Sequence, residues 1–389
     1  MKEKSSNMSP IYKSAIAPYV PTAVTELIGS RGVDVLKRIG VEEVKRVVAD
    51  VLCGVNLRDS TEMLTRRRIG MLNAATLVLF LHGIMASKKF IDKLPSIAVE
   101  GLRGHPSKQE QWLLQWVLGL TTKGVQNILR DSASGALDTY QGKFDATNND
   151  IVQRCIKEFG VIAGSIQLDG EQKVPLSWDF LLHLFCTIGS QTLAIRGSEK
   201  STYGKLFERL VLGSVLQVLG FKHVKPPLKE TKNVFWLSNR IGTRESDAAV
   251  LCGPGKAVRF DIGFIGRGNP EISKDKVSRF ERELEVAGEK HFCATIVVVD
   301  SIGERSKIQE QVKAINGTII QMSMSYWPKL LAKALRLKVG YQHRICDMPD
   351  SQVETFLRKE VSKVRIESFV ESTSELISQE QDEESGEES

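Results

Sequence analysis

The chain has 389 residues, of which 42% are hydrophobic and 26% charged; this balance is typical of a soluble globular protein of two or three domains, not of a disordered chain. The formal net charge is +6, but residues 366–389 carry nine acidic side chains and no lysine or arginine, so residues 1–365 carry +15 and favour a polyanionic partner. Six cysteines without a CxxC pair argue against a disulfide framework and a zinc site.

Residues 1–165 are predicted to be mostly helical. Met1–Pro10 is polar and charged and no apolar segment follows it, so we expect no signal peptide and a cytoplasmic location. Apolar residues spaced three and four apart in 24–52 predict two helices with a break at Gly40. The apolar run 71–86 is interrupted by polar residues and too short to span a bilayer, so we interpret it as a core helix and expect no membrane association.

Three consecutive arginines, Arg66 to Arg68, stand just before that core helix. Successive helical residues turn by about 100°, so three of them spread round roughly 200° and cannot all meet one row of phosphates. They either contact a phosphate backbone singly or are solvated and paired with nearby acidic side chains. Further along, Trp112 and Trp116 are interpreted as core packing, with stacking on bases as the alternative.

A segment with glycine and charged residues at 163–175 marks an expected domain boundary. An apolar helix is predicted over 178–188, and 191–200 then delivers polar and basic groups ahead of a helix over 203–219. In this last helix Glu208 falls inside the apolar arc. A glutamate is rarely buried without a partner, so Glu208 either binds a cation beside the neighbouring sheet or pairs locally with a lysine or arginine.

The stretch between that helix and the next strand is expected to be a loop with six positive side chains. They are Lys222, Lys225, Lys229, Lys232, Arg240 and Arg244. Such a cluster serves phosphate binding, or it is an exposed surface loop.

Residues 244–265 are predicted to form a β-hairpin with an acidic residue on each arm. The Gly/Pro cluster at 252–256 is the turn. On the second arm apolar residues alternate with Asp261, and Asp247 opens the first arm. Two carboxylates held together repel unless a cation lies between them, and an all-oxygen ligand set suits Mg²⁺ or Mn²⁺. The alternative is that both are solvated residues at strand ends; Glu245 is a second-choice acidic residue here.

The rest of the chain completes an α/β pattern. The segments predicted next are a helix at 273–288, a buried strand at 293–299, a helix at 306–315 and a strand at 318–322. With the helix over 203–219 they give the order αββαβαβ, a mixed central sheet flanked by helices on both faces. The predicted domains are 1–165, mostly helical; 166–340, α/β; 341–365, a C-terminal helical extension; and 366–389, an acidic tail expected to be disordered.

Gly204–Glu208 with its apolar helix, Ser246–Asp247 and Phe260–Gly263 together resemble the catalytic core of the PD-(D/E)XK nuclease superfamily. More narrowly, the run FDIGFIGRGNPEISKDKVSRFERE, with Ile195–Lys200 and Met322–Trp327, is similar to the CfrBI type of bacterial type II restriction endonucleases. The superfamily resemblance covers residues 195–330 and implies a restriction-endonuclease-like sheet.

The resemblance implies roles for individual residues. Asp247 stands where the superfamily has the aspartate of its PD dipeptide, although Ser246 precedes it. Asp261 stands at the acidic position of (D/E)XK, and Glu208 matches the helical glutamate that often completes the metal site. All three would be catalytic residues and ligands of Mg²⁺, with Mn²⁺ as a substitute. The chain departs from the pattern at Gly263, where the motif has lysine.

The missing cation is expected from the following helix, with Lys276 as first choice and Lys274 as second. Glu283 lies on the same edge of that helix and is a second-choice catalytic residue. The alternative is that this helix presents a solvated face with local ion pairs. The residues expected to contact DNA are Arg196, Lys200, Arg240, Arg244, Arg267 and Arg279.

The function implied is that of a type II restriction endonuclease, which makes Mg²⁺-dependent, sequence-specific double-strand cuts with 5′-phosphate ends. Double-stranded DNA would be the partner, a homodimer the working form, and a cognate DNA methyltransferase the genetic partner. The helical domain over residues 1–165 would serve DNA binding or dimerisation. The alternatives are a catalytically inactive nuclease-fold protein that binds DNA or acts as a scaffold, and a less specific DNA repair nuclease.

Overall fold

A computed structural model of the chain describes residues 14–28, 36, 39–104, 106–130, 135–225, 232–237, 246–264, 294–300, 317–324 and 326–370. The chain divides into two compact units. Unit 1 comprises 1–30 and 65–200, and unit 2 comprises 31–64 and 201–389. Residue 165, where a domain boundary was expected, therefore lies inside unit 1. Besides the passage at 30/31, the chain crosses between the units at 64/65 and 200/201, and both of these positions lie within long helices.

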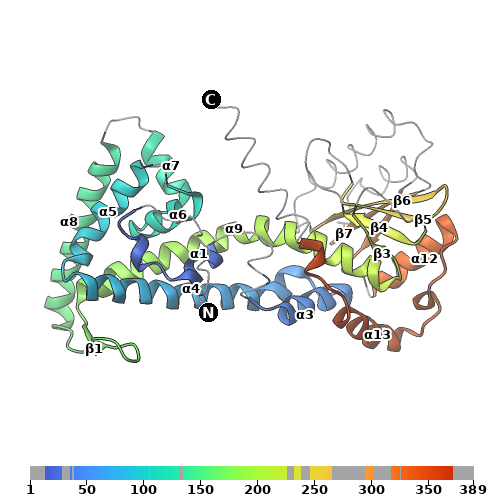
Figure 1. Cartoon of the computed structure of the whole chain (residues 1–389), viewed down its shortest axis with the longest axis horizontal. Helices are drawn as coiled ribbons and strands as arrows, with labels where there is room; N and C mark the ends of the chain where they lie inside the picture. Colours follow the sequence, from blue (N-terminus) through green and yellow to red (C-terminus); the bar gives the residue numbers. More distant parts are fainter. Residues whose placement is uncertain are drawn as a thin grey trace, which may run out of the picture. The chain divides into compact units, whose positions relative to one another are not determined.

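Unit 1 is almost entirely helical (Figure 1). Its elements besides the long helices are η1 (Ala17–Tyr19), α1 (Thr22–Ile28), α5 (Phe90–Arg103), α6 (Lys108–Val117), α7 (Thr122–Arg130), α8 (Ala136–Phe159) and the two-stranded antiparallel sheet of β1 (Ser165–Ile166) and β2 (Val174–Pro175). The core is built around Leu72, Phe80 and Leu114, with Trp116 fully buried and Trp112 packed against it. The interpretation of both tryptophans as core residues is confirmed.

The helix α4 (Leu57–Ala86) is longer than predicted, because it includes the three arginines. By length and composition α4 could cross a membrane. Several of its apolar side chains, such as Leu79 and Phe80, are fully buried in the unit 1 core, as in a core helix. Arg68 is also buried, and its guanidinium donates to the carbonyls of Leu27 and Ile28 where α1 ends. Only Arg66 and Arg67 are exposed, so Arg68 caps a helix and does not face solvent.

The helix α9 (Trp178–Val218) merges three segments that the sequence separates. The predicted helices at 178–188 and 203–219 are its two ends, and the polar stretch between them is helical too. The stretch contains no proline, and a glycine inside a helix costs only about 1 kcal/mol relative to alanine, so Gly189 and Gly197 do not interrupt the helical hydrogen bonds. One continuous helix therefore replaces the predicted helix, linker and helix.

The described residues of unit 2 contain a six-stranded mixed sheet with the strand order β3-β4-β5-β6-β7-β8. The strands are β3 (Lys222–His223), β4 (Val234–Leu237), β5 (Ala248–Gly253), β6 (Lys256–Gly263), β7 (Ala294–Val299) and β8 (Gly317–Gln321). Strands β4, β5 and β6 run antiparallel, whereas β7 and β8 continue parallel to β6. The predicted hairpin and the strands at 293–299 and 318–322 are confirmed, and the mixed α/β class with them. Strands β3 and β4 lie in the segment that was predicted to be a basic loop.

The two faces of this sheet have different environments. In β5, β6 and β7 the even-numbered residues, such as Phe260 and Ile262, join the hydrophobic core of unit 2. Phe207 of α9 belongs to the same core, as do residues of α3 (Val41–Leu52) and α12 (Trp327–Val339). Along the β5–β6 hairpin the odd-numbered residues, which include Asp247 and Asp261, belong to the opposite face. The predicted helices at 273–288 and 306–315 lie outside the described residues.

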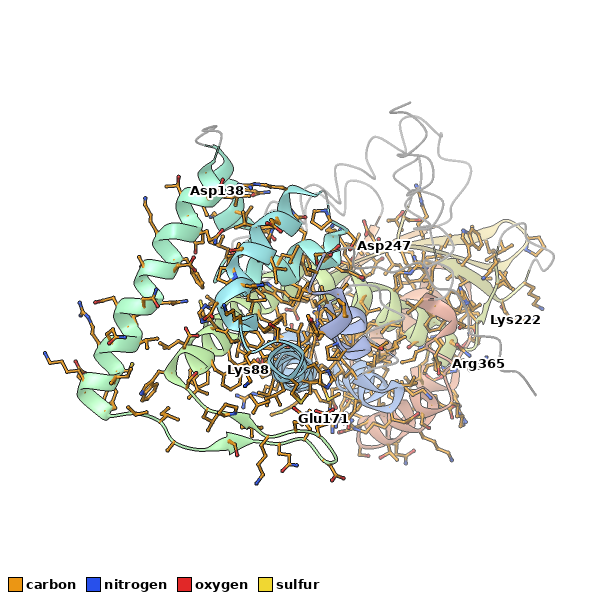
Figure 2. The ribbon with its side chains drawn as sticks, turned by 60° about the vertical axis from the view of Figure 1, so that its left-hand side comes forward. Lys88, Asp138, Glu171, Lys222, Asp247 and Arg365 are labelled. Atoms are coloured by element: carbon orange, nitrogen blue, oxygen red, sulfur yellow. The ribbon has the colours of Figure 1, made fainter. Side chains whose placement is uncertain are left out.

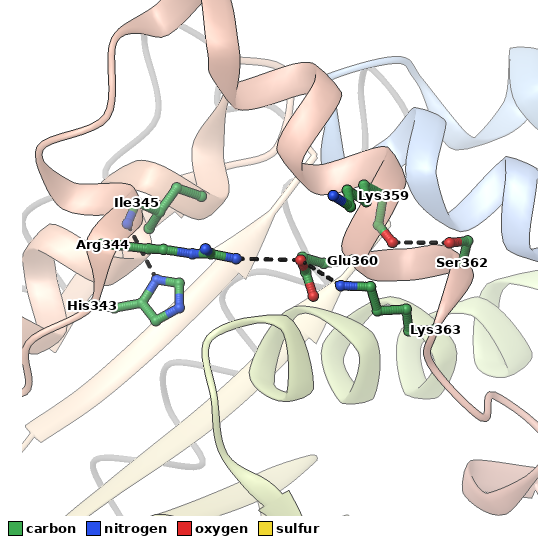
Figure 3. Close-up of polar contacts among 7 residues, drawn as sticks. All are labelled: His343, Arg344, Ile345, Lys359, Glu360, Ser362 and Lys363. Atoms are coloured by element: carbon green, nitrogen blue, oxygen red, sulfur yellow. Dashed lines mark hydrogen bonds and ion pairs between the residues drawn. The ribbon is translucent and has the colours of Figure 1, made fainter.

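The C-terminal extension predicted at 341–365 is helical and packs on α3. It contains η2 (Arg344–Cys346) and α13 (Asp350–Ser362). Arg358 of α13 pairs with Asp50 of α3 at 2.8 Å. In the same extension Glu360 accepts from Arg344 and Lys363 (Figure 3). These contacts attach the end of α13 to η2 and to α3.

Residues 366–370, which were predicted to belong to a disordered tail, are part of the fold. Ile366, Phe369 and Val370 are buried in the unit 2 core. Phe369 contacts the α9 backbone at Gly213, where an added Cβ would lie 2.9 Å from its ring. Residues 366–370 were assigned to the tail because of the acidic residues around them. Three of these five residues have apolar side chains, and burial of those side chains holds the segment in the core. Residues 371–389 lie outside the described residues.

Candidate active site

The hairpin β5–β6 places Asp247 and Asp261 opposite each other. Its turn uses Gly255 with a φ of +70°, a conformation that favours glycine. The register pairs Ala248 with Phe260. One step further along this register Asp247 stands opposite Asp261, and directly opposite residues of an antiparallel pair project from the same face. Of the two arrangements left open by the sequence, the structure has the one in which the carboxylates share a face.

The Asp247 carboxylate is anchored to the opposite strand. Its Oδ2 accepts a hydrogen bond of 2.8 Å from the backbone N–H of Ile262, the residue after Asp261. Asp247 is half-buried at the start of β5 (Figure 2), and Asp261 is only 6% exposed. The two acidic residues are therefore not freely solvated strand ends. A backbone donor fixes the first, and burial limits the rotamers of the second.

The third predicted acidic residue, Glu208, is not brought into the same group. It is half-buried on α9, whose neighbouring residue Phe207 packs into the core on the even-numbered face of the sheet, opposite the face of the aspartates. Among the residues that the structure describes, no three His, Cys, Asp or Glu side chains gather closely enough to hold a metal ion. The structure thus brings Asp247 and Asp261 opposite each other, and the metal-binding roles of Asp247, Asp261 and Glu208 all stay predictions.

Most of the predicted basic site residues, and two second-choice acidic ones, lie outside the described residues. The basic ones are Lys274, Lys276, Arg240, Arg244, Arg267 and Arg279, and the acidic ones are Glu245 and Glu283. The side chain of Lys200 is also outside the described part of the chain. Arg196 is described and exposed on α9, in the part of the helix that belongs to unit 1. Lys222 and Lys225 are exposed at β3 (Figure 2 labels Lys222). Gly263, where the resembling motif has lysine, ends β6 beside Val299 of β7.

Two polar residues near the pair were missed as site candidates. Arg259 precedes Asp261 by two positions in β6, so its side chain projects from the same face, and it is half-buried. Asp300 follows β7, where its N–H donates to Gly263 at 3.3 Å and its carboxylate accepts from Asn56. The period-two pattern alone placed Arg259 on the face of Asp261, whereas only the parallel β6–β7 register places Asp300 beside Gly263.

The donor set of the pair fits a hard divalent cation. Both groups are carboxylates, and oxygen ligands are those that Mg²⁺ and Mn²⁺ prefer. Two like charges on facing residues of adjacent strands are stabilised by a cation between them. One carboxylate is already oriented by the Ile262 N–H, which lowers the entropy lost on binding.

Two comparisons with known proteins match the chain to the same family. A family model described as CfrBI restriction endonuclease matches residues 41–307, which include Glu208, Asp247 and Asp261. A curated relative, the type II restriction enzyme CfrBI from Citrobacter freundii, is 36% identical over 344 residues, which is 87% of this chain and 93% of the relative. No solved structure matches the chain.

Proposed function

The chain belongs to the CfrBI restriction endonuclease family, and from this premise we propose that it is a type II site-specific deoxyribonuclease whose reaction centre is the Asp247–Asp261 pair. Its substrate is double-stranded DNA, which suits the basic body of the chain. The products are a 5′-phosphate and a 3′-hydroxyl, and the cofactor is Mg²⁺, with Mn²⁺ as a substitute.

The observation that carries this proposal is the anchored cross-strand pair. The Ile262 N–H holds the Asp247 carboxylate beside Asp261, so the chain itself orients two oxygen donors on one face. Burial of Asp261 keeps bulk water from screening the charges that develop during cleavage. A metal ion bound there supplies Lewis acidity and a water of lowered pKa. Glu208 is proposed as a further ligand.

The cation that the motif position 263 lacks is assigned to Lys276, with Lys274 second. A lysine at that place stabilises negative charge on the scissile phosphate, a role that glycine cannot fill. We further propose a two-fold dimer, in which each protomer cuts one strand, and a cognate methyltransferase that protects the host's own sites. The protein acts in the cytoplasm, where its DNA substrate lies.

The glycine at position 263 favours one competing function, that of a nuclease-fold scaffold that binds DNA without cutting it. A third candidate is a repair nuclease of low sequence specificity. Incubation of a plasmid and a phage genome with the protein and Mg²⁺ separates these functions. Discrete fragments support the restriction enzyme, intact DNA that is retarded in a gel supports the scaffold, and a smear supports the repair nuclease.

Asp247→Asn and Asp261→Asn tie the reaction to the pair. Both substitutions conserve side-chain size and remove a charge, so each variant should fold and fail to cut. Asp347→Asn is the matched control, because Asp347 pairs with Arg336 at the surface of unit 2. If both active-site variants cut as well as the control, the pair is not the reaction centre.

A further inference from the structure

The helices α6 and α7 are joined by a turn of defined geometry. The N–H of Leu120 donates to the backbone carbonyl of Gln115 at 2.8 Å, and the N–H of Gly119 donates to the backbone carbonyl of Trp116 at 2.9 Å. These two bonds form a Schellman motif, which ends α6 with a residue in the left-handed region. Gly119 has a φ of +71°, and a Cβ there would also lie 2.7 Å from the sulfur of Cys186. Glycine is therefore required at this position for two reasons.

Side-chain hydrogen bonds also hold the start of α7. Thr121 caps the helix, because its Oγ1 accepts from the N–H of Gly124 at 3.4 Å. Thr122 donates from its hydroxyl to the buried side chain of Gln115 at 3.2 Å, which ties α7 to α6. Tyr140 of α8 donates to the carbonyl of Leu118 at 2.9 Å. The turn is thus held by the two helices that it joins and by a third helix that packs on α7.

Over residues 122–128, where the side chains of α7 are described, the exposed face consists of hydrogen-bonding side chains. Val125 is 4% exposed and belongs to the unit 1 core, so it sets the inward face of the helix. The residues at the opposite positions are all polar and exposed. They are Thr122, Lys123, Gln126 and Asn127. Asparagine and glutamine carry a donor and an acceptor side by side, which is the arrangement that pairs with N6 and N7 of adenine in the major groove.

The charge of this helix pair suits a polyanion. Between residues 106 and 130 the only acidic residue is Glu110. It is 1% exposed and accepts from the backbone N–H of Ser14, so its carboxylate is turned inward. Lys108 in the first turn of α6 and Lys123 in the first turn of α7 are both exposed. The outward surface of the pair therefore presents positive charge and neutral hydrogen-bonding groups.

From these observations we propose that α6 and α7 form a helix-turn-helix module that reads DNA sequence, with α7 in the major groove. Two helices joined by a short glycine-containing turn, with a polar second helix facing outward, are what this recognition mode requires. Gln126 and Asn127 contact adenine edges, whereas Lys108 and Lys123 contact phosphates. The inference rests on the proposed function in that the ligand is double-stranded DNA, and it assigns sequence reading to a part of the chain other than the aspartate pair.

The test selects DNA without cutting it. A pool of duplexes with a randomised centre is incubated with the full-length protein in EDTA, and the retained duplexes are sequenced. Wild-type protein should enrich one motif with adenine at defined positions. Gln126→Ala and Asn127→Ala should each reduce the preference for one adenine by roughly 5- to 100-fold. Lys123→Ala should weaken binding to all duplexes alike and reduce the dependence of affinity on salt.

Asn149→Ala and Gln153→Ala are matched controls. They remove the same two kinds of amide from exposed positions of α8. Gln153 lies about 25 Å along that helix from its first residue, at 1.5 Å per residue. Both controls should retain the wild-type motif. Asn127→Arg tests the module without loss of function, because arginine pairs with guanine and should change one adenine of the motif to guanine.

The outcomes separate this module from the cleavage function. If the wild-type protein cuts DNA at a discrete site but the α7 variants keep the full wild-type motif, the module is refuted and the nuclease stands. If no DNA is cut but the α7 variants still change the selected motif, the module stands and the proposed nuclease fails. A motif that changes equally in the α8 controls also refutes the module.

Discussion

Asp247 reaches across the hairpin to the backbone of Ile262, with 2.8 Å between its Oδ2 and the amide nitrogen. Ile262 lies two residues beyond the last β6 residue that pairs with the start of β5. The carboxylate therefore continues the ladder where backbone pairing stops, and Asp247 itself stands opposite Asp261 in the register. The Asp247 side chain thus contributes a hydrogen bond to the fold and a negative charge to the proposed reaction. Different substitutions can remove the charge with or without the hydrogen bond.

Asp247→Asn and Asp247→Ala should differ in stability but not in activity. Asparagine keeps an oxygen that accepts from the Ile262 N–H, whereas alanine leaves that N–H without its acceptor and should lower the free energy of unfolding by about 1–3 kcal/mol. Both remove the charge and should slow cleavage by on the order of 1000-fold. Urea unfolding and a plasmid cleavage rate measure the two effects. Equal destabilisation by both variants would show that the bond contributes little.

Divalent metal should stabilise the protein through the aspartate pair. Two facing carboxylates repel, so a cation bound between them raises the free energy of unfolding by mass action. Millimolar Mg²⁺ should raise the Tm of the wild-type protein and not that of Asp261→Asn, with Asp347→Asn as the control that keeps the full shift. The same metal should restore cleavage after chelation by EDTA. An equal Tm shift in Asp261→Asn would place the metal elsewhere.

His223 should make unit 2 less stable in acid. Burial, followed by the positive charges of Arg209 and Lys225, lowers the pKa of His223 from its ordinary value of 6.5 to about 4. The unfolded chain therefore binds a proton first, and the stability contributed by the neutral ring is complete above pH 6.5 and is lost as the pH falls toward 4. His223→Phe should show a smaller drop in Tm between pH 7.5 and pH 5 than the wild type.

The ring environment explains the choice of phenylalanine for that variant. His223 lies 5.1 Å from Phe235 and 5.1 Å from Phe369, measured between ring centroids, so an aromatic ring without a titrating group fits the site. His82→Phe is the control in unit 1, where the histidine side chain is more than a third exposed. A drop in Tm that is the same for wild type and His223→Phe would argue against this titration.

Phe369 should be as important for stability as a residue of a central strand. Its ring is fully buried against Gly213 of α9. Phe369→Ala should lower the free energy of unfolding by about 3–5 kcal/mol, and Gly213→Ala by about 1–3 kcal/mol because the added methyl overpacks the contact. Leu337→Ala is the control, since Leu337 is 84% exposed. Thermal unfolding that is unchanged in Phe369→Ala would contradict the buried position.

Lys276 should act in the chemical step. It is the first-choice replacement for the lysine that position 263 lacks, although it lies outside the described residues. Lys276→Ala should lower the cleavage rate of bound DNA strongly and leave the affinity for DNA nearly unchanged, whereas Lys274→Ala should retain most of the rate. Single-turnover cleavage and a binding titration in EDTA measure these quantities. Loss of rate in Lys274→Ala alone would transfer the role to that residue.

The aspartate pair could be predicted from the sequence because all of its determinants lie within 22 residues. The Gly/Pro turn and the period-two alternation specify a hairpin, and the register of a short hairpin follows from its turn. The continuous burial of β7 was likewise visible as an unbroken run of β-branched residues. The position of Glu208 relative to the sheet could not be predicted in the same way. Periodicity placed Glu208 in the apolar arc of its helix, but it does not specify which face of the sheet that arc covers.

The chain by itself thus determined the hairpin, the strand class of its neighbours and the acidic residues that face each other. Only the tertiary structure decided that α9 is one helix, that Phe369 is buried, and that α6 and α7 form an outward-facing pair. The physical reason is the range of the interactions. Turns and alternating strands depend on neighbours in sequence, whereas the burial of Phe369 against Gly213, 156 positions away in the sequence, depends on contacts that no local pattern encodes.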